Sequence, residues 1–182
     1  YVALANLDRV NVCWFSDVLQ EDLGLTRGKS QFHSVLEYLR QPPAARRSTS
    51  LEACFRAPPL RLKRPVLIFV ISDFFDPAGY ESPLNLLRHH QSELHLVHVL
   101  DPRELDPQLS GDLRLTDCES GQTFDLTATD PLVRDYQRTL RDWLEALERF
   151  CLESGVGYAR AASDQPFEDL VLRVLRDGLM LR

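Results

Sequence analysis

One apolar run constrains the fold of this chain more than any other stretch. Residues 65–73 are Pro-Val-Leu-Ile-Phe-Val-Ile-Ser-Asp, so seven consecutive apolar residues, mostly β-branched or aromatic, precede Ser72 and Asp73. Such a run is typical of a strand that is buried on both faces. Helical patterns lie on either side of it, which favours a central position in a parallel sheet. Because open α/β sheets bind ligands at the carboxyl ends of their strands, we expect any function to involve Asp73.

The rest of the chain alternates between strand and helix patterns. Strands are expected at residues 10–15, 93–100 and 158–162, and two alternating segments at 113–116 and 123–126 predict a β-hairpin. Helices are expected at 30–39, at 51–55 after an N-cap at Ser48 or Thr49, at 82–90, at 130–154 and after Asp164. This order predicts one α/β domain over residues 1–182, with a doubly wound, mostly parallel sheet flanked by helices. The hairpin, at about residues 111–127, is expected as an insertion at one edge.

Charge and composition argue against several classes of function. The chain carries a net charge of −6, which provides no basic patch for nucleic acid, and no apolar run approaches the roughly 20 residues of a membrane helix. The four cysteines form no C-x-x-C pair, so we expect reduced thiols and a cytoplasmic location. The chain begins at Tyr1 without a basic flank or a cleavage signature, so we expect a fragment of a longer protein, and a membrane anchor could lie in the remainder.

The common motifs of catalysis and cofactor binding do not occur in the sequence. The chain has no Gly-rich nucleotide turn, no P-loop and no G-x-S-x-G elbow. His95 and His98 lie three apart on one expected strand, so they should point to opposite faces and cannot share a metal ion. We therefore expect no catalytic residue and no cofactor-binding residue.

Oxygen-bearing side chains remain as candidates for a site. They are Asp73 and Asp76 after one strand, Asp101 and Glu104 after a presumed neighbour, and Thr49 at a helix start. Carboxylate, hydroxyl and water oxygens are the ligands that Mg²⁺ prefers. The alternative is that these acids cap helices and turns, since Asp101 precedes Pro102 as an N-cap would and Asp76 is followed by Pro77 as in a turn. The residues alone leave both interpretations open.

Four stretches resemble the bacterial domain of unknown function 58. They are Asp8 to Asp17, Arg64 to Pro77, His98 to Leu105 and Ser163 to Leu170. The resemblance implies a von Willebrand factor A-like fold, and members of this family often accompany MoxR-type AAA+ ATPases. It also implies a metal-ion-dependent adhesion site, in which Asp73 matches the Asp of the third loop and Thr49 matches the Thr of the second.

The same resemblance implies that part of this site and part of the sheet are missing. The Asp-x-Ser-x-Ser turn that supplies the other metal ligands does not occur in the sequence. We therefore expect no tightly bound metal in this chain, and Mg²⁺ or Mn²⁺ only in the intact protein. The first strand of the fold should lie between residues 10–15 and 65–73, and its loss would leave unpaired strand edges that favour self-association.

Three functional hypotheses follow. The leading one is a non-catalytic protein–protein interaction module that works with a MoxR-type AAA+ ATPase, with Asp76, Asp101 and Glu104 as candidate partner contacts beside Asp73 and Thr49. The alternative is a Mg²⁺-dependent phosphohydrolase built on Asp73 and Asp101, although neither of the two lysines, at positions 29 and 63, follows a strand. The third is a purely structural domain in which Asp73 is a turn residue.

Overall fold

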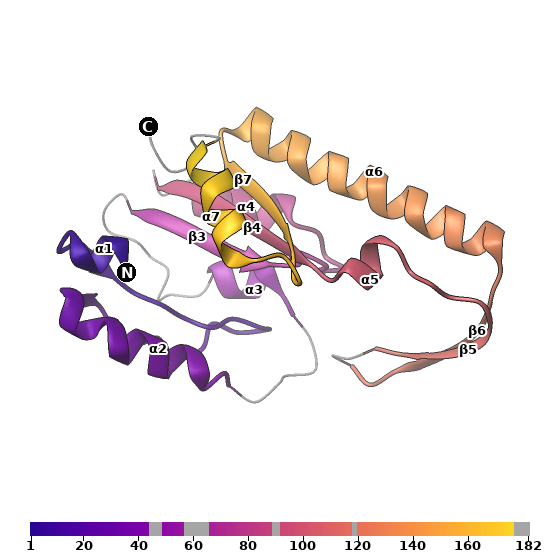
Figure 1. The fold of residues 1–182 in the computed structure, drawn as a ribbon, viewed down its shortest axis with the longest axis horizontal. Coiled ribbons are helices and arrows are strands. Elements are labelled where there is room, and N and C mark those ends of the chain that lie inside the picture. Colours follow the sequence, from indigo (N-terminus) through magenta and orange to yellow (C-terminus); the bar gives the residue numbers. More distant parts are fainter. Residues whose placement is uncertain (44–48, 57–65, 89–91, 118–119, 177–182) are drawn as a thin grey trace.

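The centre of the molecule is a three-stranded parallel sheet (Figure 1). The computed structural model describes residues 1–43, 49–56, 66–88, 92–117 and 120–176. The strands are β3 (Leu67–Ser72), β4 (Glu93–Leu100) and β7 (Gly157–Ala162), in the order β3-β4-β7. Both pairings are parallel, with Ser72 opposite His98 and Leu100 opposite Ala162. The sheet confirms the expected α/β class.

Helices cover one face of this sheet and enclose the main core. They are α3 (Leu51–Arg56), α4 (Glu81–Arg88) and α6 (Asp130–Ser154). Leu84, Leu147 and Cys151 from these helices pack in one cluster with Val70 of β3 and Leu96 of β4. The even-numbered residues of β3 and β4 face this core, as the two-residue period of a strand requires. The last helix, α7 (Phe167–Arg176), follows β7 and is drawn across the strands in Figure 1.

Local signals explain the start and end of the long helix α6. The Thr129 hydroxyl accepts a hydrogen bond from the Leu132 amide at 3.4 Å, and Pro131 occupies the first turn, where its missing N–H costs nothing. Gly155 ends the helix with φ +66°, a left-handed conformation that suits a residue without Cβ.

A two-stranded antiparallel hairpin stands between α5 (Pro102–Leu105) and α6. It is formed by β5 (Gly111–Thr116) and β6 (Thr123–Ala128), with Leu113 opposite Leu126. Its strands pair only with each other within the described part of the chain, and Figure 1 shows the hairpin projecting away from the parallel sheet.

The predicted position of the 65–73 strand is wrong. β3 lies at an edge of the sheet, and β4 is the central strand. Leu67, Phe69 and Ile71 are 54%, 39% and 61% exposed, so β3 is buried on its core face and open on the other. The apolar run marks a strand but does not specify how many strands pair with it, and the neighbour expected between residues 10–15 and 65–73 is not among the described strands. Pro65 lies outside the described residues.

The predicted strand at 10–15 is also wrong as a member of the parallel sheet. Only Arg9–Val10 forms a strand, β1, and it pairs antiparallel with β2 (Thr26–Arg27). The segment turns back on itself, with a bridge between Phe15 and Leu19, because its carbonyls find amides a few residues further along the chain.

The remaining elements surround this N-terminal ribbon. They are α1 (Val2–Ala5), the 3-10 turn η1 (Lys29–Gln31) and α2 (Phe32–Arg40). Ser48, one of the two expected N-caps of α3, and residues 89 and 90 of the helix expected at 82–90 lie outside the described residues. No described helix is long and apolar enough to cross a membrane.

Candidate functional site

Three segments that are distant in sequence meet at the start of α3. The Ser16 carbonyl accepts hydrogen bonds from the Ser50 amide at 2.8 Å and from the Cys54 thiol at 3.2 Å. The Leu51 amide donates to Asp76 Oδ2 at 2.7 Å. The loop after residue 15, the start of α3 and the loop after β3 are therefore joined at the carboxyl end of β3.

Electrostatics support the same convergence. Burial raises the pKa of the Cys54 thiol, and the nearby charges of Asp17 and Asp76 raise it further against the hydrogen bond to Ser16. Two carboxylates from different loops thus lie close enough to act on one buried thiol. The sequence named Asp76 as a candidate site residue, whereas Ser16 and Asp17 appeared only within the Asp8 to Asp17 stretch that carries the family resemblance.

Asp73 stands on a tightly specified turn within this region. Its Oδ1 accepts the Phe75 amide at 3.1 Å, while the Ser72 hydroxyl accepts the Phe74 amide, also at 3.1 Å. Phe74 has φ +58°, which is costly for a bulky residue, and its buried ring compensates by packing in the core. The turn holds the exposed Asp73 carboxylate outward, with one oxygen engaged by the backbone.

The candidate residues differ in how many of their side-chain oxygens already accept hydrogen bonds. Both oxygens of Asp76 accept backbone amides, from Leu51 at 2.7 Å and from Ala78 at 2.8 Å, so this side chain acts as a remote cap of α3. The described residues contain no group of three or more His, Cys, Asp or Glu side chains that could hold a metal ion.

Asp101 and Glu104 form a capping box on α5. Asp101 Oδ1 accepts the Arg103 amide at 2.8 Å, and Glu104 Oε2 accepts the Asp101 amide at 2.9 Å. The Arg103 guanidinium binds both Asp101 oxygens, at 2.9 and 2.7 Å, and lowers the pKa of Asp101 to about 2. All of these hydrogen bonds join residues of α5 and its N-cap, as expected if the acids cap a helix. None of them connects Asp101 or Glu104 to Asp73.

His98, which its spacing from His95 set aside as a metal ligand, lies beneath the Asp73 turn. It is fully buried, and its Nδ1 lies 2.9 Å from the Tyr158 hydroxyl. Its Nε2 has no hydrogen bond of standard geometry in the described part of the chain. Burial lowers the pKa of His98 to about 4, although the backbone and charge of Asp73 favour the protonated ring. The register of β4 could have indicated this position, because residue 98 follows the buried even-numbered residues 94 and 96.

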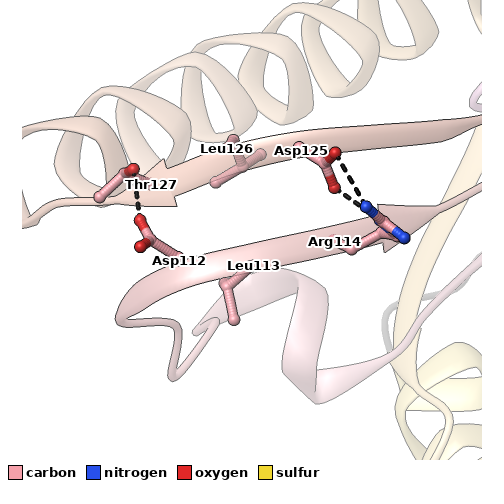
Figure 2. Close-up of a pocket in the computed structure, with 6 residues that line it drawn as sticks. All are labelled: Asp112, Leu113, Arg114, Asp125, Leu126 and Thr127. Atoms are coloured by element: carbon pink, nitrogen blue, oxygen red, sulfur yellow. Dashed lines mark hydrogen bonds and ion pairs between the residues drawn. The ribbon is translucent and has the colours of Figure 1, made fainter.

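Two hollows in the surface lie away from this region. One, of about 560 Å³, lies on the polar face of the hairpin, where Arg114 binds Asp125 at 2.6 and 3.1 Å and Thr127 donates to Asp112 at 2.6 Å (Figure 2). The other, of about 520 Å³, lies along α6 beside Leu105 and Arg160. In the first, Arg114 neutralises Asp125, and the Asp112 carboxylate accepts a hydrogen bond from Thr127, so each charged side chain already has a partner on the other strand.

Comparison with known proteins identifies a family but no activity. The family model described as "Protein of unknown function DUF58" matches residues 1–144. An uncharacterized protein of Mycobacterium avium is 29% identical over 114 residues, which cover 48% of this chain and 66% of that protein. Uncharacterized proteins of Mycobacterium bovis and Mycobacterium tuberculosis are each 30% identical over 112 residues, covering 59% of this chain and 34% of theirs.

The chain therefore spans about two thirds of one relative and one third of the others. No solved structure matches it. Since the family model covers well over half of the chain, the chain belongs to the DUF58 family of proteins of unknown function.

Proposed function

We propose that this chain is a non-catalytic protein-interaction domain that binds its partner at the edge formed by Asp73, Thr49 and the Ser16–Asp17 loop. The observation that carries the proposal is the junction at α3, where Ser16 and Asp76 hold the Ser50 and Leu51 amides. This junction joins three loops at the carboxyl end of β3, where the Asp73 carboxylate is exposed and accepts the Phe75 amide through one oxygen. An exposed carboxylate suits recognition of amide or basic donors on a partner.

The arrangement of loops also supports a von Willebrand factor A-like fold. In such a domain three loops converge at the carboxyl edge of a parallel sheet, the hairpin at 111–128 is an insertion, and a further strand lies beside β3. We propose that the region is the remnant of a metal-ion-dependent adhesion site, and that partner recognition by this chain proceeds without a tightly held cation. Titration with Mn²⁺ followed by calorimetry should give no binding in the micromolar range, and micromolar affinity would overturn this part.

A MoxR-type AAA+ ATPase is the partner that we propose, on the strength of the family relationship. A cytoplasmic location is proposed with it, because Cys13, Cys54 and Cys151 are free thiols in the structure. We propose that Asp101 and Glu104 contribute to partner binding only indirectly, because their carboxylate oxygens already cap α5.

The competing proposal, a phosphohydrolase that uses Asp73 and Asp101, predicts a different result. Such an enzyme needs the Asp101 carboxylate to be open to a metal ion or a substrate, yet both of its oxygens bind the Arg103 guanidinium. A screen of generic phosphoesters with Mg²⁺ separates the two functions. The interaction domain predicts no turnover above buffer, whereas turnover that Asp73→Asn abolishes would establish the enzyme.

A further inference from the structure

The β5–β6 hairpin has one polar face and one apolar face. Residues opposite each other on paired strands share a face, and neighbours along a strand alternate between faces. On the polar face, charged and hydroxyl side chains pair across the strands, as Figure 2 shows. The register gives the other face, which we call the apolar hairpin face, four large apolar side chains: Leu113, Leu115, Phe124 and Leu126.

The apolar hairpin face has no cover among the described elements. β5 and β6 make extensive contact only with each other in the described part of the chain, and Phe124 is 54% exposed and Leu115 39%. The hairpin does not join the parallel sheet, so a further strand beside β3 would extend that sheet and not the hairpin. A two-stranded hairpin is only marginally stable in water unless another element packs against it. We therefore expect another molecule to cover this face.

Negative charge surrounds the apolar hairpin face. Residues 104–130 carry seven acidic side chains and one arginine, which accounts for the whole net charge of −6, because the rest of the chain is balanced. Asp106 and Asp130 lie at the base of the hairpin, Asp117 follows the end of β5, and all three are exposed. A two-stranded ribbon is thin, so charges on either face act within about one Debye length, 8–10 Å. The face therefore favours an apolar partner that also carries basic side chains.

We propose that the apolar hairpin face is the docking site of a basic amphipathic helix from a partner protein. The apolar stripe of that helix covers the four side chains, and its flanking Lys and Arg residues lie near the acidic ones. Two strands about 4.8 Å apart present a face about as wide as one helix. Each strand has six residues, a length of roughly 20 Å, which about 13 helical residues span. This surface is separate from the Asp73 edge, and it takes a different partner.

Charge selects this occupant over two others. A second copy of the chain would bring two acidic segments together, because a twofold interface places the same patch against itself. The negative surface of a membrane would repel the same carboxylates. A basic helix gains both the burial of the apolar side chains and the attraction of opposite charges.

Designed helical peptides test the chemistry of the partner. The probe is a peptide of about 18 residues, with leucines along one face and lysines on both flanks, and the matched control has glutamate in place of every lysine. Fluorescence anisotropy should show saturable binding of the lysine peptide and binding of the glutamate peptide that is at least roughly tenfold weaker. Added salt should weaken binding of the lysine peptide, because it screens the attraction.

Substitutions on the hairpin test the location. Phe124→Ser and Leu115→Ser should each weaken binding of the lysine peptide by roughly fivefold or more, because each removes an apolar contact. Leu115→Ser keeps the test valid if Phe124→Ser disturbs the hairpin, as judged by circular dichroism. Leu152→Ser is the matched control, because Leu152 is 82% exposed near the far end of α6, and it should bind as the unmodified chain does.

Methyl NMR gives a second measurement of the location. The lysine peptide should shift the methyl resonances of Leu113, Leu115 and Leu126 and leave those of Leu147, in the main core, unchanged. Shifts confined to other methyl groups would overturn the proposal. So would equal binding of the lysine and glutamate peptides, binding that Phe124→Ser and Leu115→Ser both leave intact, or no binding at roughly 1 mM.

Measurements on the chain without peptide test the other occupants. Sedimentation should reveal no dimer that Phe124→Ser dissociates, and phosphatidylglycerol vesicles should not bind the chain through this face. A Phe124-dependent dimer would overturn the proposal in favour of a second copy. Binding to vesicles that Phe124→Ser abolishes would overturn it in favour of a lipid surface.

Discussion

Removal of the Asp76 carboxylate should destabilise the whole domain, even though the residue lies in a loop. Its two oxygens cap the α3 amide of Leu51, which is fully buried, and the amide of Ala78 in its own turn. Loss of an N-cap costs about 1 kcal/mol, and a hydrogen bond to a charged group contributes about 1.5–3 kcal/mol. We therefore expect Asp76→Ala to lower the free energy of unfolding by about 2 kcal/mol, which for a chain of this size lowers Tm by about 4–8 °C.

Urea unfolding followed by circular dichroism measures this change. The m value should stay the same, because the surface exposed on unfolding does not change. Asp76→Asn keeps one acceptor and should lose about half as much. Asp73→Ala is the matched control in the same loop: Asp73 is exposed and accepts one amide of its own turn, so its loss should cost about 0.5 kcal/mol. Equal effects of Asp76→Ala and Asp73→Ala would refute the assignment of Asp76 as the structural cap.

Three further predictions concern the core. Burial lowers the pKa of His98 from 6.5 to about 4, so on acidification the unfolded chain takes up a proton before the folded chain does. The neutral, buried His98 therefore contributes about 3 kcal/mol to the free energy of unfolding above pH 6.5, and this contribution is lost as the pH falls from 6.5 to 4. The difference in unfolding free energy between the unmodified chain and His98→Asn should change over that pH range. A constant difference would show that protonation of His98 does not produce the pH dependence. Gly157→Ala should cost about 1–3 kcal/mol, because a Cβ there would overlap the buried His95 ring; unchanged urea unfolding would show that the ring moves freely. Leu147→Ala in the main cluster should cost about 2–5 kcal/mol, while Leu152→Ala on the exposed side of α6 should leave the unfolding midpoint unchanged.

The sequence predicts well those elements whose limits depend on local chemistry. The strand Glu93–Leu100 matches its predicted bounds, because alternating burial and turn residues on both sides mark it. The helix from Asp130 to Ser154 is likewise marked by Pro131 and Gly155. The strand at Pro65–Asp73 was located but its place in the sheet was not, because apolarity reports what a residue prefers and not whether a neighbour covers it.

The candidate site was only partly predictable for a similar reason. Asp73, Asp76 and Thr49 stood out as oxygen ligands near strand and helix ends. The bond from the Leu51 amide to Asp76 joins positions 25 apart, and no local pattern announces it. His98 was considered as a metal ligand and set aside, yet its burial beneath the Asp73 turn depends on which strands are neighbours. Contacts between strand ends depend on the order of the strands in the sheet, and local patterns in a single sequence give little information about that order.

Binding of the proposed partner ATPase shows whether the Asp73 edge takes part in recognition. The chain is immobilised and titrated with the MoxR-type AAA+ ATPase of the same organism, in parallel with the Asp73→Ala variant and with Asp112→Ala on the hairpin as a surface-charge control. We expect saturable binding that Asp73→Ala weakens at least tenfold and that Asp112→Ala leaves unchanged. Binding of equal strength by the chain and both variants would contradict it, because the Asp73 edge would then take no part in recognition.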